Sequence, residues 1–509
     1  MGDEVSLALR RYLLLFLIGF AAYFNSIPHP FVHDDVVFIQ NNQTLGDWND
    51  VPSLFLHSSI AGGTLSIVNS YYRPLLDILY KIQYALFALN PHGYHLFNVL
   101  LHIANSILVY RLILLLLQAF GGDNFNPEAF AFCTAMFFLI HPVQTEAVAC
   151  IAGVSNLIFA FFCLLSLICY VNARQRESSR CGIGWYGAAL IFFLVALFSK
   201  EQAIMLPLLV GLVEVALAPS HLVGGSVSFR MRALRLAGFF ITAFGYLSFR
   251  NIVAGNSIAS ILTYKGELIL RILHIPEVLL MFLGILVFPY GLHYYHSTDI
   301  LQPYFFSTVT LIFLLGALAF LIKGLPRDSR HWLIFAGGWF LVTLLPVLNI
   351  VPLINEYSLI LTAEHFLYLP IIGFVLFALW LGSFVMQKIF QVKSLKINAL
   401  LVSLLGLICI AATIKQNTYW RGEIPLFERV VRFEKDFGRG HILLAKAYYF
   451  HQEYDRAIVQ YNIALRIMQS YLSRTKVPEA KKFYLGFIQE IYFDLAHCSE
   501  AKETNHGKF

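Results

Sequence analysis

Charged residues are scarce in this chain. Asp, Glu, Lys and Arg make up 13% of the 509 residues, while hydrophobic residues make up 58%. A soluble chain carries about 25% charged residues. Because so little charge cannot cover a water-exposed globule, the lipid bilayer is expected to be the main solvent. This composition excludes a soluble enzyme, a nucleic-acid-binding protein and a disordered scaffold as the main interpretation.

The charge is also unevenly distributed along the chain. Residues 416–509 contain 14 Lys and Arg and 11 Asp and Glu, about a quarter of that stretch, which is an ordinary soluble density. The sequence therefore predicts two domains. Residues 1–415 form a transmembrane domain with outer loops at 28–93 and 256–303, and residues 416–509 form a small soluble helical domain.

Apolar runs long enough to cross a bilayer recur through the first domain. Each span needs about 20 predominantly apolar residues, and we expect about eleven of them. The segment 272–288 is apolar but is expected to lie in the outer interface, because a crossing there would place the basic loop 323–331 outside. The expected spans are 11–27, 94–118, 128–141, 147–171, 184–198, 202–218, 235–255, 304–322, 332–348, 366–386 and 398–415.

Positive charge alternates between successive connections. The connections 172–183, 219–235, 323–331 and 387–397 hold twelve Lys and Arg against two acidic residues, and the alternate connections are rich in acid. Cytoplasmic loops carry an excess of Lys and Arg. The N-terminus is therefore expected in the cytoplasm and residues 416–509 on the other side of the membrane.

The soluble stretch carries a helical repeat pattern at 440–467. Large and small residues stand where a tetratricopeptide unit packs its two helices. An ordinary amphipathic hairpin is the alternative. The second helix of an earlier, broken unit is expected before it, at 427–434, and a degenerate helical pair after it, at 478–500. Such units bind a peptide or a partner helix, or cap a neighbouring unit. The matching positions are Leu444, Ala445, Tyr448, Ala457, Tyr461 and Ala464.

Two adjacent acids, Asp34 and Asp35, follow the first span on the predicted outer side. Adjacent carboxylates repel, so one of them tends to have a raised pKa. That suits a general base acting on a hydroxyl, or a metal ligand. The alternative is a pair of solvated loop acids.

Other ionisable residues gather on the same predicted face. Each has a structural alternative: a helix start at Glu146, a local ion pair between Lys200 and Glu201, and snorkelling of Arg73 to lipid headgroups. Together they offer a base and cations for a leaving phosphate, as a reaction on a membrane-bound phosphate donor requires. A transporter more often keeps its charges near the bilayer midplane. The set comprises Arg73, His141, Glu146, Lys200, Glu201, Glu364 and His365.

The order of these motifs resembles a known family, the transmembrane-and-tetratricopeptide O-mannosyltransferase-like branch of the GT-C membrane glycosyltransferases. The resemblance covers nearly the whole chain, ending with a tetratricopeptide after the last span. The matching segments are PFVHDDVVFIQNN at 30–42, the stretch 71–105 that begins YYRPLL, HPVQTEAVACIAG at 141–153, FSKEQAIMLPLL at 198–209 and AEHFLYLPIIGF at 363–374.

The resemblance implies a mainly helical GT-C-like bundle and an inverting transfer of a sugar. The donor would be a polyprenyl-phosphate sugar, and the acceptor a hydroxyl of a protein or glycan outside the cytoplasm. Asp34 would be the catalytic acid of the first outer loop, with Asp35 beside it, and Glu146 the second acidic site. Arg73 and Lys200 would lie near the donor phosphate. No cofactor is required, and any divalent metal would lie near the two aspartates.

The chain departs from the family pattern at two places. After the HP-x-x-TEAV turn the family usually has Gly-Arg and an acidic residue two or three positions on. This chain reads Gly153-Val154-Ser155-Asn156 there, so the Arg and the acid are missing. The family has Arg before Tyr-Leu-Pro, where this chain has His365, a weaker and pH-dependent cation.

Two other functions stay open from the sequence. One is a catalytically decayed membrane scaffold that binds a protein partner through its tail, and the other is a transporter of lipid-linked sugar. The compact loops and short tail favour a bacterial or archaeal cytoplasmic membrane over the endoplasmic reticulum.

Overall fold

A computed structural model describes residues 2–56, 72–120, 126–176, 180–217, 229–254, 268–325, 327–350, 357–388, 391 and 395–506. Parts of the predicted outer loops, residues 57–71 and 255–267, lie outside the described residues. The same holds for residues 177–179, 218–228, 326, 389–390 and 392–394 of the predicted cytoplasmic connections.

The chain forms two compact units. The first comprises Met1–Ser257, Ile312–Pro346 and His365–Thr418, and the second comprises Ile258–Leu311, Val347–Glu364 and Tyr419–Phe509. The second unit thus joins nearly all of the predicted soluble domain to two segments that come earlier in the chain.

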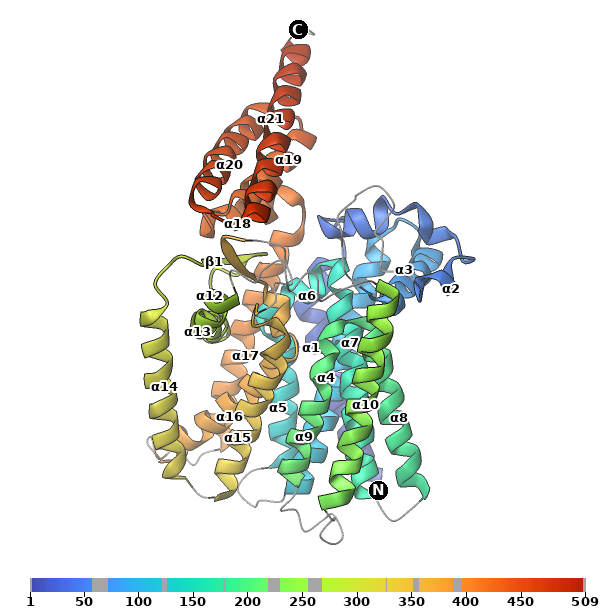
Figure 1. Ribbon diagram of the computed structural model, residues 1–509. Helices are drawn as coiled ribbons and strands as arrows, with labels where there is room; N and C mark the ends of the chain where they lie inside the picture. The colour runs from blue at the N-terminus through green and yellow to red at the C-terminus, as the bar shows by residue number, and fades with distance from the viewer. Residues whose placement is uncertain are drawn as a thin grey trace. The chain divides into compact units, whose positions relative to one another are not determined.

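The first unit is a bundle of long helices that run roughly parallel or antiparallel to one another (Figure 1). Helix α4 packs against α1, α5 and α7, while α15 packs against α9 and α16. The helices are α1 (Gly2–Tyr23), α2 (Val51–Leu54), α3 (Pro74–Phe87), α4 (Pro91–Phe120), α5 (Pro127–Ile140), α6 (Thr145–Ala149), α7 (Val154–Gln175), α8 (Arg180–Ser199), α9 (Leu206–Leu217), α10 (Phe229–Ala254), α15 (Arg327–Leu344), α16 (Pro370–Lys388) and α17 (Leu395–Asn417). Helix α14 (Phe305–Lys323) begins in the second unit and continues into the first.

The described residues contain nine helices long and apolar enough to cross a membrane, or ten if the bent pair Pro127–Ile140 and Pro142–Ala149 is one span. The prediction of a polytopic helical membrane protein is confirmed. The predicted total of about eleven included 202–218, where the described part is a 3₁₀ turn followed by the twelve-residue helix α9. That is shorter than the roughly 20 residues a span needs. Helix α13 (Ile275–Val287) is likewise too short to span.

The first predicted outer loop is held by a buried lysine. Lys81, on α3, is 2% exposed and donates to the carbonyl oxygens of Thr44 (2.5 Å) and Asp47 (2.6 Å). Its ammonium also lies 2.8 Å from the Asp50 carboxylate. Because a buried ammonium is costly unless its three N–H groups are satisfied, this residue fixes the path of the loop over α3.

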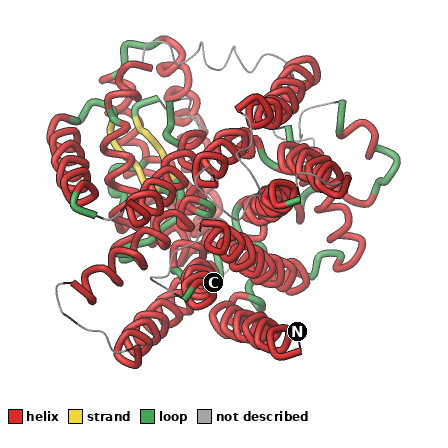
Figure 2. The backbone as a smooth tube through the Cα atoms, turned by 90° about the horizontal axis from the view of Figure 1, so that it is seen from below, coloured by secondary structure: helices red, strands yellow, loops and turns green. Residues whose placement is uncertain are grey.

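The second unit is built from short elements and four helices of the tail. Two strands, β1 (His296–Asp299) and β2 (Leu359–Thr362), pair antiparallel with His296 opposite Thr362. Figure 2 shows these strands in yellow among the helices in red. The helices are α12 (Leu268–Leu273), α13, α18 (Glu423–Phe433), α19 (Gly438–Phe450), α20 (Tyr454–Arg474) and α21 (Pro478–His506).

The tail helices pack in sequence order, α18 on α19, α19 on α20 and α20 on α21. All six residues of the repeat pattern are buried, each 3% exposed or less. The alternation of large and small side chains therefore lets α19 and α20 approach closely, as predicted. The predicted degenerate helical pair at 478–500 is wrong, because those residues lie within the single helix α21.

The close packing of α19 and α20 predicts the effect of a larger side chain. Ala464 is fully buried, and Ala464→Leu is expected to destabilise the hairpin by about 1–3 kcal/mol through overpacking. That corresponds to a roughly 5- to 150-fold larger equilibrium constant for opening of the two helices, measured as faster hydrogen–deuterium exchange on the full-length protein in detergent. Val459→Leu, at a position of α20 that is 55% exposed, is the control and should leave exchange unchanged. Equal exchange in the two variants would contradict the packing argument.

Candidate functional site

Asp34 and Asp35 follow α1 in a tight turn. His33 has a φ of 54°, in the left-handed region that residues other than glycine seldom adopt. The two carboxylate oxygens of Asp35 accept backbone N–H bonds from Val32 (3.1 Å) and Ala152 (2.7 Å). These bonds tie the turn to the segment that follows α6.

The two aspartates have different surroundings. Asp35 is 1% exposed, and its burial raises its pKa to about 7, although the N–H bonds from Ala152 and Val32 oppose the shift. The Asp34 side chain is 42% exposed and lies 3.5 Å from the His33 ring. Asp34 is therefore the carboxylate open to an incoming molecule, and Asp35 is the one that holds the turn.

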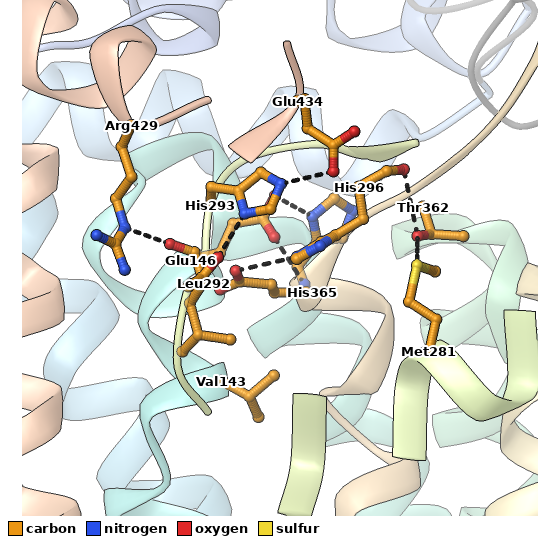
Figure 3. Close-up of polar contacts among 12 residues, drawn as sticks. Val143, Glu146, Met281, Leu292, His293, His296, Thr362, His365, Arg429 and Glu434 are labelled. Atoms are coloured by element: carbon orange, nitrogen blue, oxygen red, sulfur yellow. Dashed lines mark hydrogen bonds and ion pairs between the residues drawn. The ribbon is translucent and has the colours of Figure 1, made fainter. Parts of the chain in front are cut away.

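Glu146 lies just past the bend between α5 and α6. The two helical segments meet at 51°, and His141 caps the 3₁₀ turn between them by accepting from the Val143 N–H at 3.2 Å. The Glu146 carboxylate is 2% exposed in the protein interior and accepts from the backbone N–H (2.9 Å) and Nδ1 (2.6 Å) of His365. Figure 3 shows these two side chains facing each other. Helix α6 does begin at Thr145, as the helix-start alternative expected, but Glu146 also accepts hydrogen bonds from His365, 219 positions later in the chain.

Arg73 and Glu201 form a two-point ion pair. The guanidinium donates through Nε (2.9 Å) and Nη2 (2.5 Å) to the two carboxylate oxygens. Burial by itself would raise the pKa of Glu201, but the charge and hydrogen bonds of Arg73 lower it to about 2. Glu201 is therefore ionised at neutral pH and orients Arg73, a partner that the local ion-pair interpretation with Lys200 did not anticipate.

Lys200 is buried beside a neutral partner. It is 3% exposed, donates to Oδ1 of Asn156 at 2.5 Å and lies 5.9 Å from the centre of the Phe159 ring. Burial, followed by the nearby charge of Arg73, lowers its pKa to about 7. A lysine that titrates near neutral pH in such a setting is typical of functional sites.

The acids and Lys200 lie close enough together for their charges to shift the pKa values of neighbouring groups. Burial, followed by the charges of Asp35, Asp34 and Glu146, raises the pKa of the Cys150 thiol. The charge of Glu146 in turn acts on the pKa of Lys200. The first unit thus brings these predicted site residues together. Glu364 instead contacts a residue of the second unit and is described below.

Sequence reasoning missed the polar face of α4. Asn98 donates to the carbonyl oxygens of Val148 (3.3 Å), Cys150 (3.0 Å) and Ile151 (3.3 Å), so it holds the turn that carries Asp35's partner. His102 and Asn105 both contact the hydroxyl of Tyr368, at 2.8 and 3.0 Å. The signal was present, because polar residues at i, i+4 and i+7 share one face of a helix.

Among the described residues, the two aspartates do not belong to a group of three His, Cys, Asp or Glu side chains with metal-ligand spacing. Both oxygens of Asp35 accept from backbone N–H groups, a role that needs no metal ion. Within the described ranges, the group of His, Cys, Asp and Glu side chains with metal-ligand spacing is in the second unit.

No family model matches the chain, and no solved structure matches it. Curated relatives do match. A protein O-mannosyl-transferase of Caenorhabditis elegans is 26% identical over 438 residues, which are 83% of this chain and 57% of the relative. Protein O-mannosyl-transferase TMTC2 of Mus musculus is 33% identical over 190 residues, 37% of this chain and 22% of the relative.

A third relative, protein O-mannosyl-transferase TMTC3 of Homo sapiens, is 31% identical over 200 residues, 38% of this chain and 20% of the relative. The chain thus spans from a fifth to just over half of the length of these relatives. The matches confirm the resemblance found in the motifs: the chain is a multi-pass membrane relative of the protein O-mannosyl-transferases.

Proposed function

We propose that the protein is an inverting glycosyltransferase that moves a sugar from a polyprenyl-phosphate donor to a hydroxyl of a protein or glycan. The observation that carries the proposal is the cluster at the turns of the first unit. It combines a half-exposed carboxylate, Asp34, with two cations, the partly buried Arg73 and the buried Lys200, that are held by other residues of the unit. The names of the relatives favour the same chemistry.

In the proposed mechanism, Asp34 is the general base. Its carboxylate takes the proton of the acceptor hydroxyl while the hydroxyl oxygen attacks the anomeric carbon. The bond from that carbon to the phosphate oxygen breaks, and the lipid phosphate leaves from the opposite face of the sugar. Asp35 keeps the turn in place through its two backbone hydrogen bonds.

The cations stabilise the charge that develops on the leaving phosphate. Arg73 and Lys200 act there because preorganised positive groups favour a transition state that gains negative charge. Glu201 orients Arg73, and Glu146 orients His365 through two hydrogen bonds. His141 shapes the turn that presents Glu146.

The alternation of basic and acidic connections supports a reaction outside the cytoplasm, with the tail on the same side. The tail would recruit the acceptor protein or another partner through its helical repeat. The choice of a bacterial or archaeal membrane over the endoplasmic reticulum stays a prediction from the sequence.

The base assignment predicts the effect of one substitution. Asp34→Asn removes the proton acceptor and is expected to lower the transfer rate by about 10²- to 10⁴-fold. The assay reconstitutes purified full-length protein with a panel of radiolabelled polyprenyl-phosphate sugars and a membrane or secretory-protein extract. Donor binding, measured on the same preparation, should be unchanged.

Asp47→Asn is the matched control, because Asp47 is an exposed acid of the same loop that accepts from the Asn49 N–H. It should retain full transfer. Wild-type transfer rates in Asp34→Asn would exclude Asp34 as the base. If the wild type binds donor without transfer, and removal of 416–509 abolishes partner binding, the scaffold interpretation replaces the proposal. Sugar movement across the membrane without a new glycosidic bond would indicate the transporter.

The lowered pKa of Lys200 predicts that kcat/KM for the donor depends on pH. As pH rises through about 7, Lys200 loses its proton and with it the positive charge that attracts the donor phosphate. We expect kcat/KM of the wild type to fall on the alkaline side, since this quantity reports the free enzyme. Lys200→Arg keeps its charge and should lose this alkaline limb.

The pKa of Asp35 lies in the same range. If kcat/KM of Lys200→Arg still falls on the alkaline side, that decrease belongs to another group, and Asp35 is the first candidate. Identical profiles in wild type and Lys200→Arg would contradict a phosphate-binding role for Lys200. The residues whose charges act on Lys200, Arg73, Glu146 and Glu201, are left unchanged in this comparison.

A further inference from the structure

We propose that His293, His296 and Glu434, in the second unit, form a binding site for a divalent transition-metal ion, with Zn²⁺ the expected occupant. One ligand atom from each residue lies within 4.8 Å of the other two. Tetrahedral zinc with bonds of 2.0–2.1 Å places its ligand atoms about 3.3 Å apart, so small side-chain adjustments close this set around an ion. Figure 3 shows the three side chains converging.

The hydrogen bonding of His293 calls for a cation beside it. Its Nδ1 contacts the carbonyl oxygen of Gly291, which can only accept, so Nδ1 carries a hydrogen. In the neutral ring, Nε2 is then a lone pair, and it faces Oε1 of Glu434 at 3.0 Å. Two acceptors at this distance need a positive species between them or close by. That species is either a proton on Nε2 or a metal ion.

His296 favours the metal. Its ring is buried and lies 4.0 Å from that of His293, centre to centre, so the two imidazoles can share one ion. Oε1 of Glu364 lies 3.3 Å from its Nε2. Glu364 stands outside the three-ligand set and suits the outer carboxylate that commonly orients a metal-bound histidine.

The surrounding contacts hold the ligands in place. Gly291 has a φ of 77°, and a side chain there would come within 2.9 Å of Phe433. The His293 ring stacks on that same Phe433 with centres 5.3 Å apart. Ser297 donates to the second oxygen of Glu434. A glycine at 291 therefore lets the loop lie directly against the end of α18, where Glu434 follows.

The site is also reachable. Ser297, Phe433 and Glu434 line a cavity of about 890 Å³ within the second unit. A metal ion can enter from that side, and water can occupy the fourth position of a three-ligand zinc site. Because the ligands come from β1, the loop before it and the end of α18, a bound ion would fasten the tail helices to this loop.

The test measures metal content in the full-length protein, purified in detergent through an affinity tag without histidine. After dialysis against a chelator, the protein is titrated with Zn²⁺ and analysed by inductively coupled plasma mass spectrometry. We expect one Zn²⁺ per chain in the wild type and none retained in His296→Ala. Glu434→Gln should weaken Zn²⁺ binding by at least tenfold, and Glu364→Gln by about 10- to 100-fold.

His441→Ala is the matched control, since His441 is a buried histidine of α19 whose ring contacts Gln460 and the Lys435 carbonyl. It should bind Zn²⁺ as the wild type does. X-ray absorption at the zinc edge of the wild type adds a measurement that does not depend on variant folding, and should show scattering from two imidazoles. A wild type that binds no stoichiometric metal, or a zinc shell without imidazole, would overturn the proposal and leave a protonated His293–Glu434 pair.

Discussion

A charge that is buried in this protein must find its partner inside it, because neither water nor the bilayer can satisfy it there. Arg174 and Glu214 show the principle in its simplest form, since they lie in contact between α7 and α9 and Tyr170 donates to the same carboxylate at 2.5 Å. The buried ammonium of Lys81 likewise has its partners inside the protein, two carbonyl oxygens and one carboxylate. Such partners fix the positions of helices and loops that apolar packing alone would leave free to slide.

The candidate site follows the same rule less completely. Lys200 has a neutral amide partner where Arg174 has a carboxylate, and Asp35 is held by N–H groups rather than by a cation. Burial shifts both groups, and these partners do not offset it in full, so both have pKa values near 7. A fully paired ion network would hold these charges fixed across the physiological range. Incomplete pairing leaves a proton or a charge available to a substrate, which is why perturbed groups gather at functional sites.

Much of this arrangement was accessible from the sequence. The apolar runs predicted most of the spans, with 202–218 the exception, and the large-small alternation from Leu444 to Ala464 predicted a hairpin whose six positions are all buried. Contacts between distant segments were not accessible, because neither periodicity nor charge counts specify which residue meets which. The bonds from His365 to Glu146 join positions 219 residues apart. In the sequence, Glu434 is one more acid at the end of a tail helix, and only the fold shows that it contacts His293.

The contacts of His365 determine what this position can donate when a histidine stands where the family pattern has an arginine. The family pattern has Arg there, which donates at any physiological pH. Here Glu146 takes the Nδ1 hydrogen and the backbone N–H of His365, so Nε2 is the ring nitrogen left to face a ligand. In the neutral ring Nε2 can only accept, and a phosphate also only accepts. In the mechanism proposed above, His365 would therefore donate to the leaving phosphate only in its doubly protonated form. Lys200, whose burial lowers its pKa to about 7, ties the positive charge of the site to pH more closely than an arginine would.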